Sequence, residues 1–171
     1  ADPLTVVVPT FSTKTIQQST PASDASNLMT VTLTANYDLM TGGPAGSNAT
    51  VTITGLAGSE TASSSSLAVT TCANNSLGTS GSWNNTGTLI LTVATTVPAN
   101  TPCAITFTLT NPSSNLTSPA VSVHAALTDG SSSIGSIASA AMVKPGTAVS
   151  GVANGADPLT VVVPTFSTKT I

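Results

Sequence analysis

The sequence predicts an all-β fold, an antiparallel β-sandwich of about eight strands. Three observations lead to this prediction: apolar residues recur with a period of two in short runs, turn-forming residues separate those runs, and no convincing helix is found. The chain has 171 residues, which is enough for a single domain with a sizeable core.

Each strand is expected to bury one of its faces. In the run LMTVTLTA at 28–35, Met29, Val31 and Leu33 alternate with threonines, which gives one apolar face and one face of hydroxyl groups. The same pattern predicts strands at 4–8, 28–35, 48–56, 66–71, 88–96, 103–112, 119–127 and, less regularly, 134–143.

Turn-forming residues separate these runs at intervals that suit hairpins and longer connections between two sheets. The stretches are TGGPAGSN at 41–48, NNSLGTSGSWNNTG at 74–87, NPSSNLTSP at 111–119 and DGSSS at 129–133. An immunoglobulin-like sandwich accommodates this number and spacing of short strands.

The composition excludes several classes of partner. Charged residues make up 5% of the chain and none is an arginine, so nucleic acid is not expected, because phosphate binding requires clustered cations. The sequence shows neither a basic amphipathic stretch nor the roughly 18 consecutive apolar residues of a spanning helix, so membrane insertion is not expected either. Instead, 32 threonines and 24 serines supply the polar positions, which is typical of a glycosylated protein that is extracellular or displayed at the cell surface.

The two cysteines, Cys72 and Cys103, are predicted to form a disulfide, because a secreted chain with an even number of cysteines usually pairs them. The bond is interpreted as a staple on the long 74–87 loop. A metal site built on the two cysteines is the weaker alternative, since His124 is the sole imidazole and zinc normally takes four ligands.

Four asparagines match the acceptor pattern for N-linked glycans, Asn-X-Ser/Thr. All four fall in or beside predicted turns, where a bulky sugar disturbs no packing. The tract SETASSSS at 59–66 is the alternative attachment region if the source lacks the N-linked machinery. The predicted glycosylation sites are Asn48, Asn74, Asn84 and Asn115.

No catalytic residue, metal site or cofactor is expected. The six acidic residues are scattered singly among turns, and no G-x-S-x-G elbow or D-x-D-x-D-G calcium loop occurs. His124 is interpreted as a structural histidine within its strand. The chain is therefore predicted not to be an enzyme.

Trp83 is the one aromatic residue that the sequence places plainly in a loop. Two roles are open for it: its ring either stacks on a sugar or caps the sandwich, and the cap is favoured. With a single aromatic platform of this kind, carbohydrate binding remains a secondary prediction.

The first sixteen residues, ADPLTVVVPTFSTKTI, recur without change at 156–171. Either the gene repeats with a period of 155 residues or a copy of the first strand has been appended. The chain is accordingly divided into a sandwich unit at 1–143, a Gly-rich linker at 144–155, and the second copy at 156–171.

The second copy is predicted to be a strand exchanged between neighbouring units, so that one copy completes its own sandwich and the other joins the next. Three apolar residues of each copy share one face, and burying them would contribute roughly 5–9 kcal/mol before ordering costs. These residues are Leu4, Val6 and Val8 in the first copy and Leu159, Val161 and Val163 in the second.

The segments GLAGS at 55–59 and ITFTLTNPSSNLTSPAVSV at 105–123 resemble the tandem sandwich repeats of very large secreted proteins of aquatic microbes, including those that form glycan-coated extracellular fibrils. The resemblance implies a structural role, with copies of the chain itself and attached glycans as partners. We therefore expect a glycosylated fibril subunit that assembles end to end by strand complementation. The alternative is a cell-surface adhesin or carbohydrate-binding stalk domain, and a third possibility is a viral fibre protein.

Overall fold

The computed structural model describes residues 6–42, 47–128 and 133–166, and the regular structure in these residues is almost entirely β-strand. Within this part of the chain, nine strands form one antiparallel sheet in the order β1-β2-β7-β4-β5-β6-β3-β8-β9. No helix among the described residues is long and apolar enough to cross a membrane. The strands are β1 (Phe11–Gln18), β2 (Ser26–Ala35), β3 (Thr50–Thr54), β4 (Ser64–Thr71), β5 (Ser80–Asn84), β6 (Thr88–Thr92), β7 (Cys103–Thr110), β8 (Ser122–Thr128) and β9 (Ser133–Ala141).

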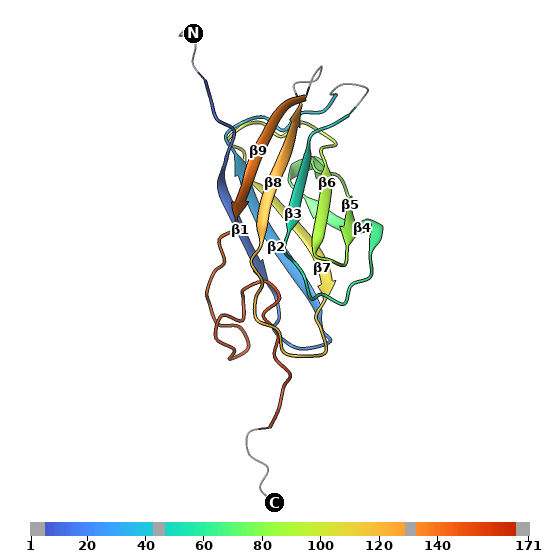
Figure 1. The fold of residues 1–171 in the computed structure, drawn as a ribbon, viewed down its shortest axis with the longest axis vertical. Helices are drawn as coiled ribbons and strands as arrows, with labels where there is room; N and C mark the ends of the chain where they lie inside the picture. Colours follow the sequence, from blue (N-terminus) through green and yellow to red (C-terminus); the bar gives the residue numbers. More distant parts are fainter. Residues whose placement is uncertain (1–5, 43–46, 129–132, 167–171) are drawn as a thin grey trace, which may run out of the picture.

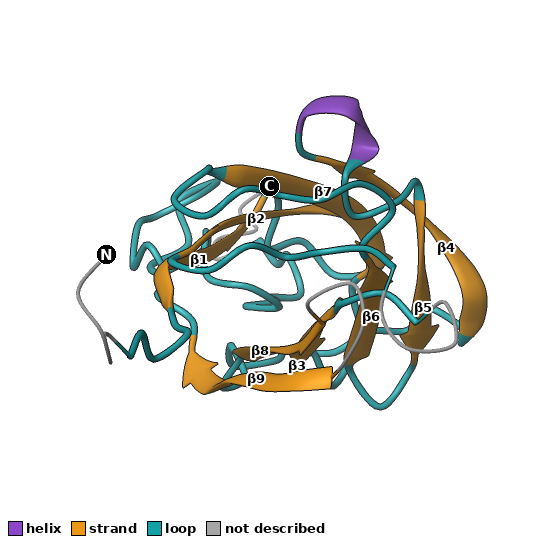
Figure 2. Ribbon diagram, turned by 90° about the horizontal axis from the view of Figure 1, so that it is seen from above, coloured by secondary structure: helices purple, strands orange, loops and turns teal. Residues whose placement is uncertain are grey.

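The sheet rolls up until its two edges nearly meet. Figure 2 shows the wall made by β1, β2 and β7 lying opposite the wall made by β3, β8 and β9. On one side β4 connects the walls, because its first half pairs with β5 and its second half with β7. On the other side Val143, just after β9, donates its N–H to Lys14 and accepts the N–H of Ile16, at 2.8 and 3.0 Å. The result is a nearly closed, flattened barrel.

The apolar side chains of the predicted alternating pattern fill the inside of this barrel. In β7, Cys103, Ile105, Phe107 and Leu109 are buried, whereas the residues between them carry mostly short hydroxyl side chains toward the outside. The same rule holds in β6, where Leu89 and Leu91 are buried and Ile90 is exposed. The all-β prediction and its assignment of inward-facing residues are confirmed on these strands.

The predicted disulfide between Cys72 and Cys103 is confirmed. Its position differs from the interpretation as a loop staple. Cys72 follows β4 directly and Cys103 begins β7, and these strands pair through only three residue positions, Val69 to Thr71 of β4. The bond therefore reinforces the short seam between the two walls. The excursion after it contains η2, a single 3-10 turn at Ala73–Asn75, which projects outward in Figure 2.

Three strand assignments from the sequence were wrong. The segment 4–8 was predicted as a strand, but its described part, Val6 to Val8, lies outside the sheet. In its place the first strand is β1, which begins after Pro9, a residue that has no N–H to donate to a strand pair. The predicted loop at 74–87 contains β5, which pairs with both β4 and β6.

Removing the disulfide should destabilise the protein. Because the bond closes a loop with a sequence separation of 31, the Cys72→Ala/Cys103→Ala variant should lose about 3–4 kcal/mol of unfolding free energy on the chain-entropy model. Urea titration followed by tryptophan fluorescence measures this loss. Wild-type protein in reductant should show a similar loss, and the double variant should not respond to reductant. An unchanged midpoint in the variant would contradict the proposed role at the seam.

Candidate functional site

The two ends of the barrel carry the two copies of the repeated sequence. In Figure 1 the chain enters β1 from one end of the long axis, and residues 144–166 gather at the opposite end. We call this second end the acceptor end; it consists of the β1–β2 turn at 19–25, the β7–β8 loop at 111–121 and the segment 144–158. We call residues 1–8 the leader and residues 156–163 the second leader.

The second leader is bound to the acceptor end through backbone hydrogen bonds to two different loops. Val161 and Leu116 exchange N–H donors across an antiparallel bridge, at 2.8 and 2.9 Å. On its other side Val162 donates to the carbonyl of Pro21 and accepts the N–H of Ser23. The segment therefore lies between the β1–β2 turn and the β7–β8 loop and covers the open end of the barrel.

Gln18, the last residue of β1, binds the second leader with its backbone and with both ends of its side-chain amide. Its N–H donates to Ala156, and its Nε2 donates to the carbonyls of Gly155 and Thr160 at 2.9 and 2.8 Å. Its Oε1 accepts the N–H of Leu159 at 2.6 Å. Gln18 is only 5% exposed, so these bonds form in a water-poor setting where an unpaired group is costly.

Two buried asparagines hold Gln18 in place. Asn27 Nδ2 donates to Gln18 Oε1 at 2.8 Å and to Asn111 Oδ1 at 2.7 Å, and both asparagines are fully buried. Asn111 in turn donates to the carbonyls of Thr20 and Ala22 in the β1–β2 turn. No buried side-chain nitrogen or oxygen of the described residues lacks a hydrogen-bond partner. The network is therefore fully satisfied with the second leader in place.

The second leader follows a specific path at its start. Leu159 is fully buried in the core, yet its φ is +54°, a conformation that non-glycine residues seldom adopt. Pro158 before it is buried, and its carbonyl accepts a hydrogen bond from Ser118 Oγ at 2.7 Å. Asp157 accepts the N–H of Gly146 through Oδ1 at 2.8 Å. Each residue of the Asp-Pro-Leu sequence is thus held by its own contacts. Further along, Val161 is also buried, whereas Val163 is 42% exposed.

The first copy of the same sequence is placed differently. Val6 and Val8 are 83% and 71% exposed, whereas their counterparts at 161 and 163 lie at the acceptor end. Leu4 lies outside the described residues. The leader is attached to its own barrel from Val8 onward, where Asn36 Nδ2 donates to the Val8 carbonyl and Asn36 Oδ1 accepts the N–H of Thr10. The second copy, predicted to be a strand that is exchanged with a neighbouring unit, packs on its own barrel in its described part, through isolated bridges at Val161 and Val162. Exchange between chains stays a prediction.

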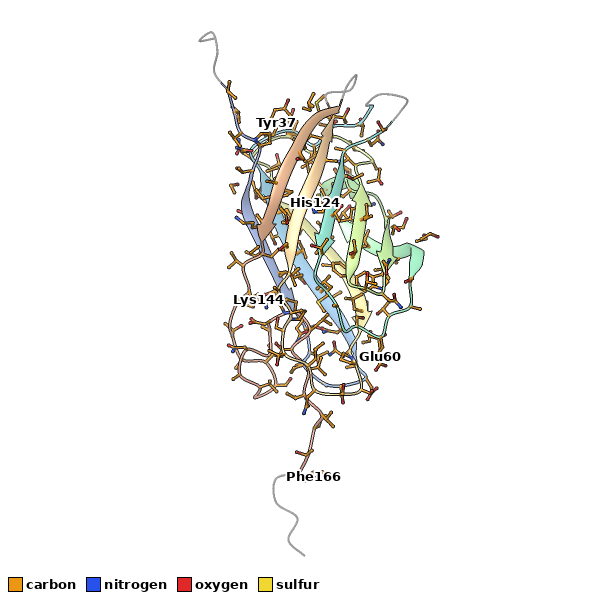
Figure 3. The ribbon with its side chains drawn as sticks, in the orientation of Figure 1. Tyr37, Glu60, His124, Lys144 and Phe166 are labelled. Atoms are coloured by element: carbon orange, nitrogen blue, oxygen red, sulfur yellow. A yellow bond between two sulfur atoms is a disulfide. The ribbon has the colours of Figure 1, made fainter. Side chains whose placement is uncertain are left out.

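The segment predicted as a Gly-rich linker is folded into a loop. Val149 and Val152 form a bridge, and Ala156 donates to the carbonyl of Thr147. A groove of about 470 Å³ lies beside this loop, and its lining includes Asn115, Lys144 and Asp157. In Figure 3, Lys144 lies at this end of the molecule, and Phe166 extends beyond it along the long axis.

The predicted glycosylation sites lie on the surface or partly so. Asn74, Asn84 and Asn115 are exposed, and Asn48 is half-buried. Asn48, Asn84 and Asn115 each use Oδ1 as a local acceptor, for the N–H groups of Gly42, Thr86 and Val163. The Nδ2 atom, to which a glycan attaches, takes no part in these bonds.

Trp83 does not have the exposed position that sugar stacking requires. It lies in β5 rather than in a loop, is 2% exposed, and donates its indole N–H to the carbonyl of Thr61 at 3.0 Å. The candidate role in sugar stacking is therefore corrected to packing in the core. Among the described residues, no three histidine, cysteine, aspartate or glutamate side chains gather as a metal site would require.

The acceptor-end amides were not identified from the sequence, although a signal for them exists. Asn27 precedes Met29, Val31 and Leu33 at a spacing of two, so it lies on the same buried face of β2. Asn111 continues the buried positions of β7 in the same way, and Gln18 continues from Ile16. In this chain, the polar residues that continue a buried face at a strand end are the ones that bind or support the second leader.

Comparison with known proteins gives no match, neither with a protein-family model nor with a curated protein sequence.

Replacing Gln18 by alanine should weaken the acceptor end. Loss of the amide leaves the Leu159 N–H and one Asn27 donor without a partner in a buried region, so the Gln18→Ala variant should lose about 2–3 kcal/mol of unfolding free energy. Urea denaturation measures the loss, and hydrogen exchange at the Leu159 amide should accelerate. The matched control is Gln17→Ala, an exposed neighbour in β1, which should change stability by less than about 0.5 kcal/mol. Equal effects of the two variants would contradict the role assigned to Gln18.

Proposed function

We propose that the chain is a structural subunit of an extracellular, glycosylated fibril whose units are joined end to end by the leader sequence. In this proposal the flattened barrel is an immunoglobulin-like sandwich, with its two walls as the two sheets. The leader of one unit completes the acceptor end of its neighbour by strand complementation. The repeat resembles the tandem units of secreted fibril proteins, and this resemblance supports the same role.

One observation carries the proposal: Val161 is buried at one end of the long axis, whereas its counterpart Val6, in the described part of the leader, is exposed at the other end. The chain leaves the acceptor end at residues 164–166, which correspond to residues 9–11, where β1 of a unit begins. In Figure 1 the described part of the chain begins and ends at opposite ends of the molecule. Units connected in this way would follow one another along their long axes, all pointing in the same direction, and such a heterologous contact continues without closing.

The surface supports an extracellular coat of sugar. The outward faces of the strands present threonine and serine instead of charged residues, as in β7, where Thr108 and Thr110 are exposed. Three of the four glycosylation sequons are exposed, and hydrophilic glycans would keep such a weakly charged fibril in solution. The disulfide is compatible with an oxidising compartment outside the cell. The buried position of Trp83 removes the sugar-stacking argument for the adhesin alternative.

Protein isolated from its native source should form unbranched filaments. Negative-stain electron micrographs should show rods one unit wide, because the contacts lie only at the two ends of the long axis. Native material that consists of single particles or of ordered two-dimensional layers would contradict the fibril.

Natively sourced protein should carry N-linked glycan on at least one sequon. The exposed Asn74, Asn84 and Asn115 are the favoured positions, and the half-buried Asn48 should be modified least. Glycopeptide mass spectrometry, with and without enzymatic release of N-glycans, measures occupancy at each site. If all four asparagines are unmodified while the 59–66 tract carries O-linked sugar, the N-linked assignment is wrong and the coat is O-linked.

A further inference from the structure

We infer that the acceptor end is a sequence-specific binding site for the leader of a second copy of this chain, in which the core selects the leucine of the leader and Gln18 binds its bent backbone. The inference deepens the proposed function, on which it rests, by naming the residues that make the joint. The occupant is a peptide with the sequence ADPLTVVV, the sequence of the leader and of the second leader.

The occupant is identified by the sequence that already fills the site. The second leader has the same residues as the leader, so the bonds it makes to Gln18, Pro21, Leu116 and Ser118 are available to a leader from elsewhere. In the described part of the leader, apolar surface is exposed to water in its own unit: Val6 is 83% exposed, whereas its counterpart Val161 is 1% exposed. Binding in trans would therefore bury apolar surface that now faces water.

The two attachments of the leader do not compete. At the acceptor end Asn115 Oδ1 accepts the N–H of Val163 at 2.7 Å, whereas at the other end Asn36 Nδ2 donates to the carbonyl of Val8 at 3.0 Å. Positions 163 and 8 are equivalent, so one residue offers its N–H to the preceding unit and its carbonyl to its own unit. The joint then contains no free linker between the two barrels.

Gln18 contributes affinity because it binds the backbone at the bend around Leu159, and the core position that holds the Leu159 side chain supplies the selectivity. Its Oε1 reaches the Leu159 N–H and its Nε2 the Thr160 carbonyl, while the Leu159 side chain enters the core with φ at +54°. A peptide without leucine at this position would leave the core pocket unfilled, whereas the groups that Gln18 binds belong to the backbone. An apolar site filled by leucine discriminates against partners that would leave it empty or bring a charge into it.

The test uses the full chain with the second leader displaced. In the Leu159→Asp variant a carboxylate would have to enter the core, so the second leader should leave the acceptor end and the leader of another copy should take its place. Sedimentation velocity should show concentration-dependent chains for this variant. Wild type should associate less than this variant at the same concentration, because its own segment competes at a high effective concentration.

Three controls accompany this variant. Val163→Asp alters an exposed residue of the same segment and should associate no more than wild type. Leu4→Asp/Leu159→Asp removes the donor as well as the competitor and should remain monomeric. A synthetic peptide of residues 1–10 should bind Leu159→Asp and cap its chains, whereas the same peptide with aspartate in place of leucine should not bind.

The role of Gln18 is measured in the same background. Peptide affinity for Gln18→Ala/Leu159→Asp should fall about 10- to 100-fold relative to Leu159→Asp, and Gln17→Ala/Leu159→Asp should bind within about 2-fold. If Leu159→Asp does not fold, wild-type protein is refolded from urea with excess fluorescent peptide, and capture of the peptide is expected. Capture should again be lost when the leucine of the peptide is replaced by aspartate.

Two results would overturn the inference. One is a folded Leu159→Asp variant that neither self-associates nor binds the peptide, and the other is equal binding of the leucine and aspartate peptides. If the acceptor end does not bind a leader from another copy, a fibril could still form by covalent continuation of the repeat alone. Conversely, peptide binding together with single particles in the native material would retain the binding site and reject the fibril.

Discussion

The structure depends on one constraint: a rolled β-sheet has an open end, and the polar groups buried there must be covered and paired. Gln18, Asn27 and Asn111 lie at this end with almost no exposure. Their amides form hydrogen bonds with one another and with the loops around them. The remaining hydrogen bonds of the Gln18 amide are made to residues 155–160. Without a segment in this position, Gln18 would be a poorly satisfied amide at the edge of an apolar core, which is costly.

The strands of the barrel run along the long axis of the molecule, and the acceptor end lies at one end of that axis. Period-two strands build the walls, and the disulfide strengthens the seam where β4 meets β7 over a short pairing. At the other edge, Val143 connects β9 to β1 and leads the chain directly into the acceptor end. The segment that closes the barrel is therefore also the one that leaves along its long axis, which relates the stability of one unit to its connection with the next.

Much of the fold could be predicted from the sequence because hydroxyl and apolar residues alternate so regularly. β1 was missed because a bulge between Phe11 and Thr13 interrupts its alternation and because its last buried residue is the polar Gln18. β5 was missed because its two inward positions are Gly81 and Trp83, so a single apolar residue marks the strand. The repeat indicated that residues 156–171 matter, but the left-handed conformation of Leu159 and the amide network depend on tertiary contacts that no local pattern encodes.

The most direct test of the central claim is the structure of the joint in a native filament, determined by cryo-electron microscopy at a resolution that shows side chains. We expect the leucine of each leader to lie beside Gln18 of the preceding unit, with the chain continuing from there into β1 of its own unit. We also expect the valine at position 8 to lie between Asn115 of the preceding unit and Asn36 of its own. An acceptor end filled by any other segment, or a leader lying along the side of its own barrel, would contradict the account.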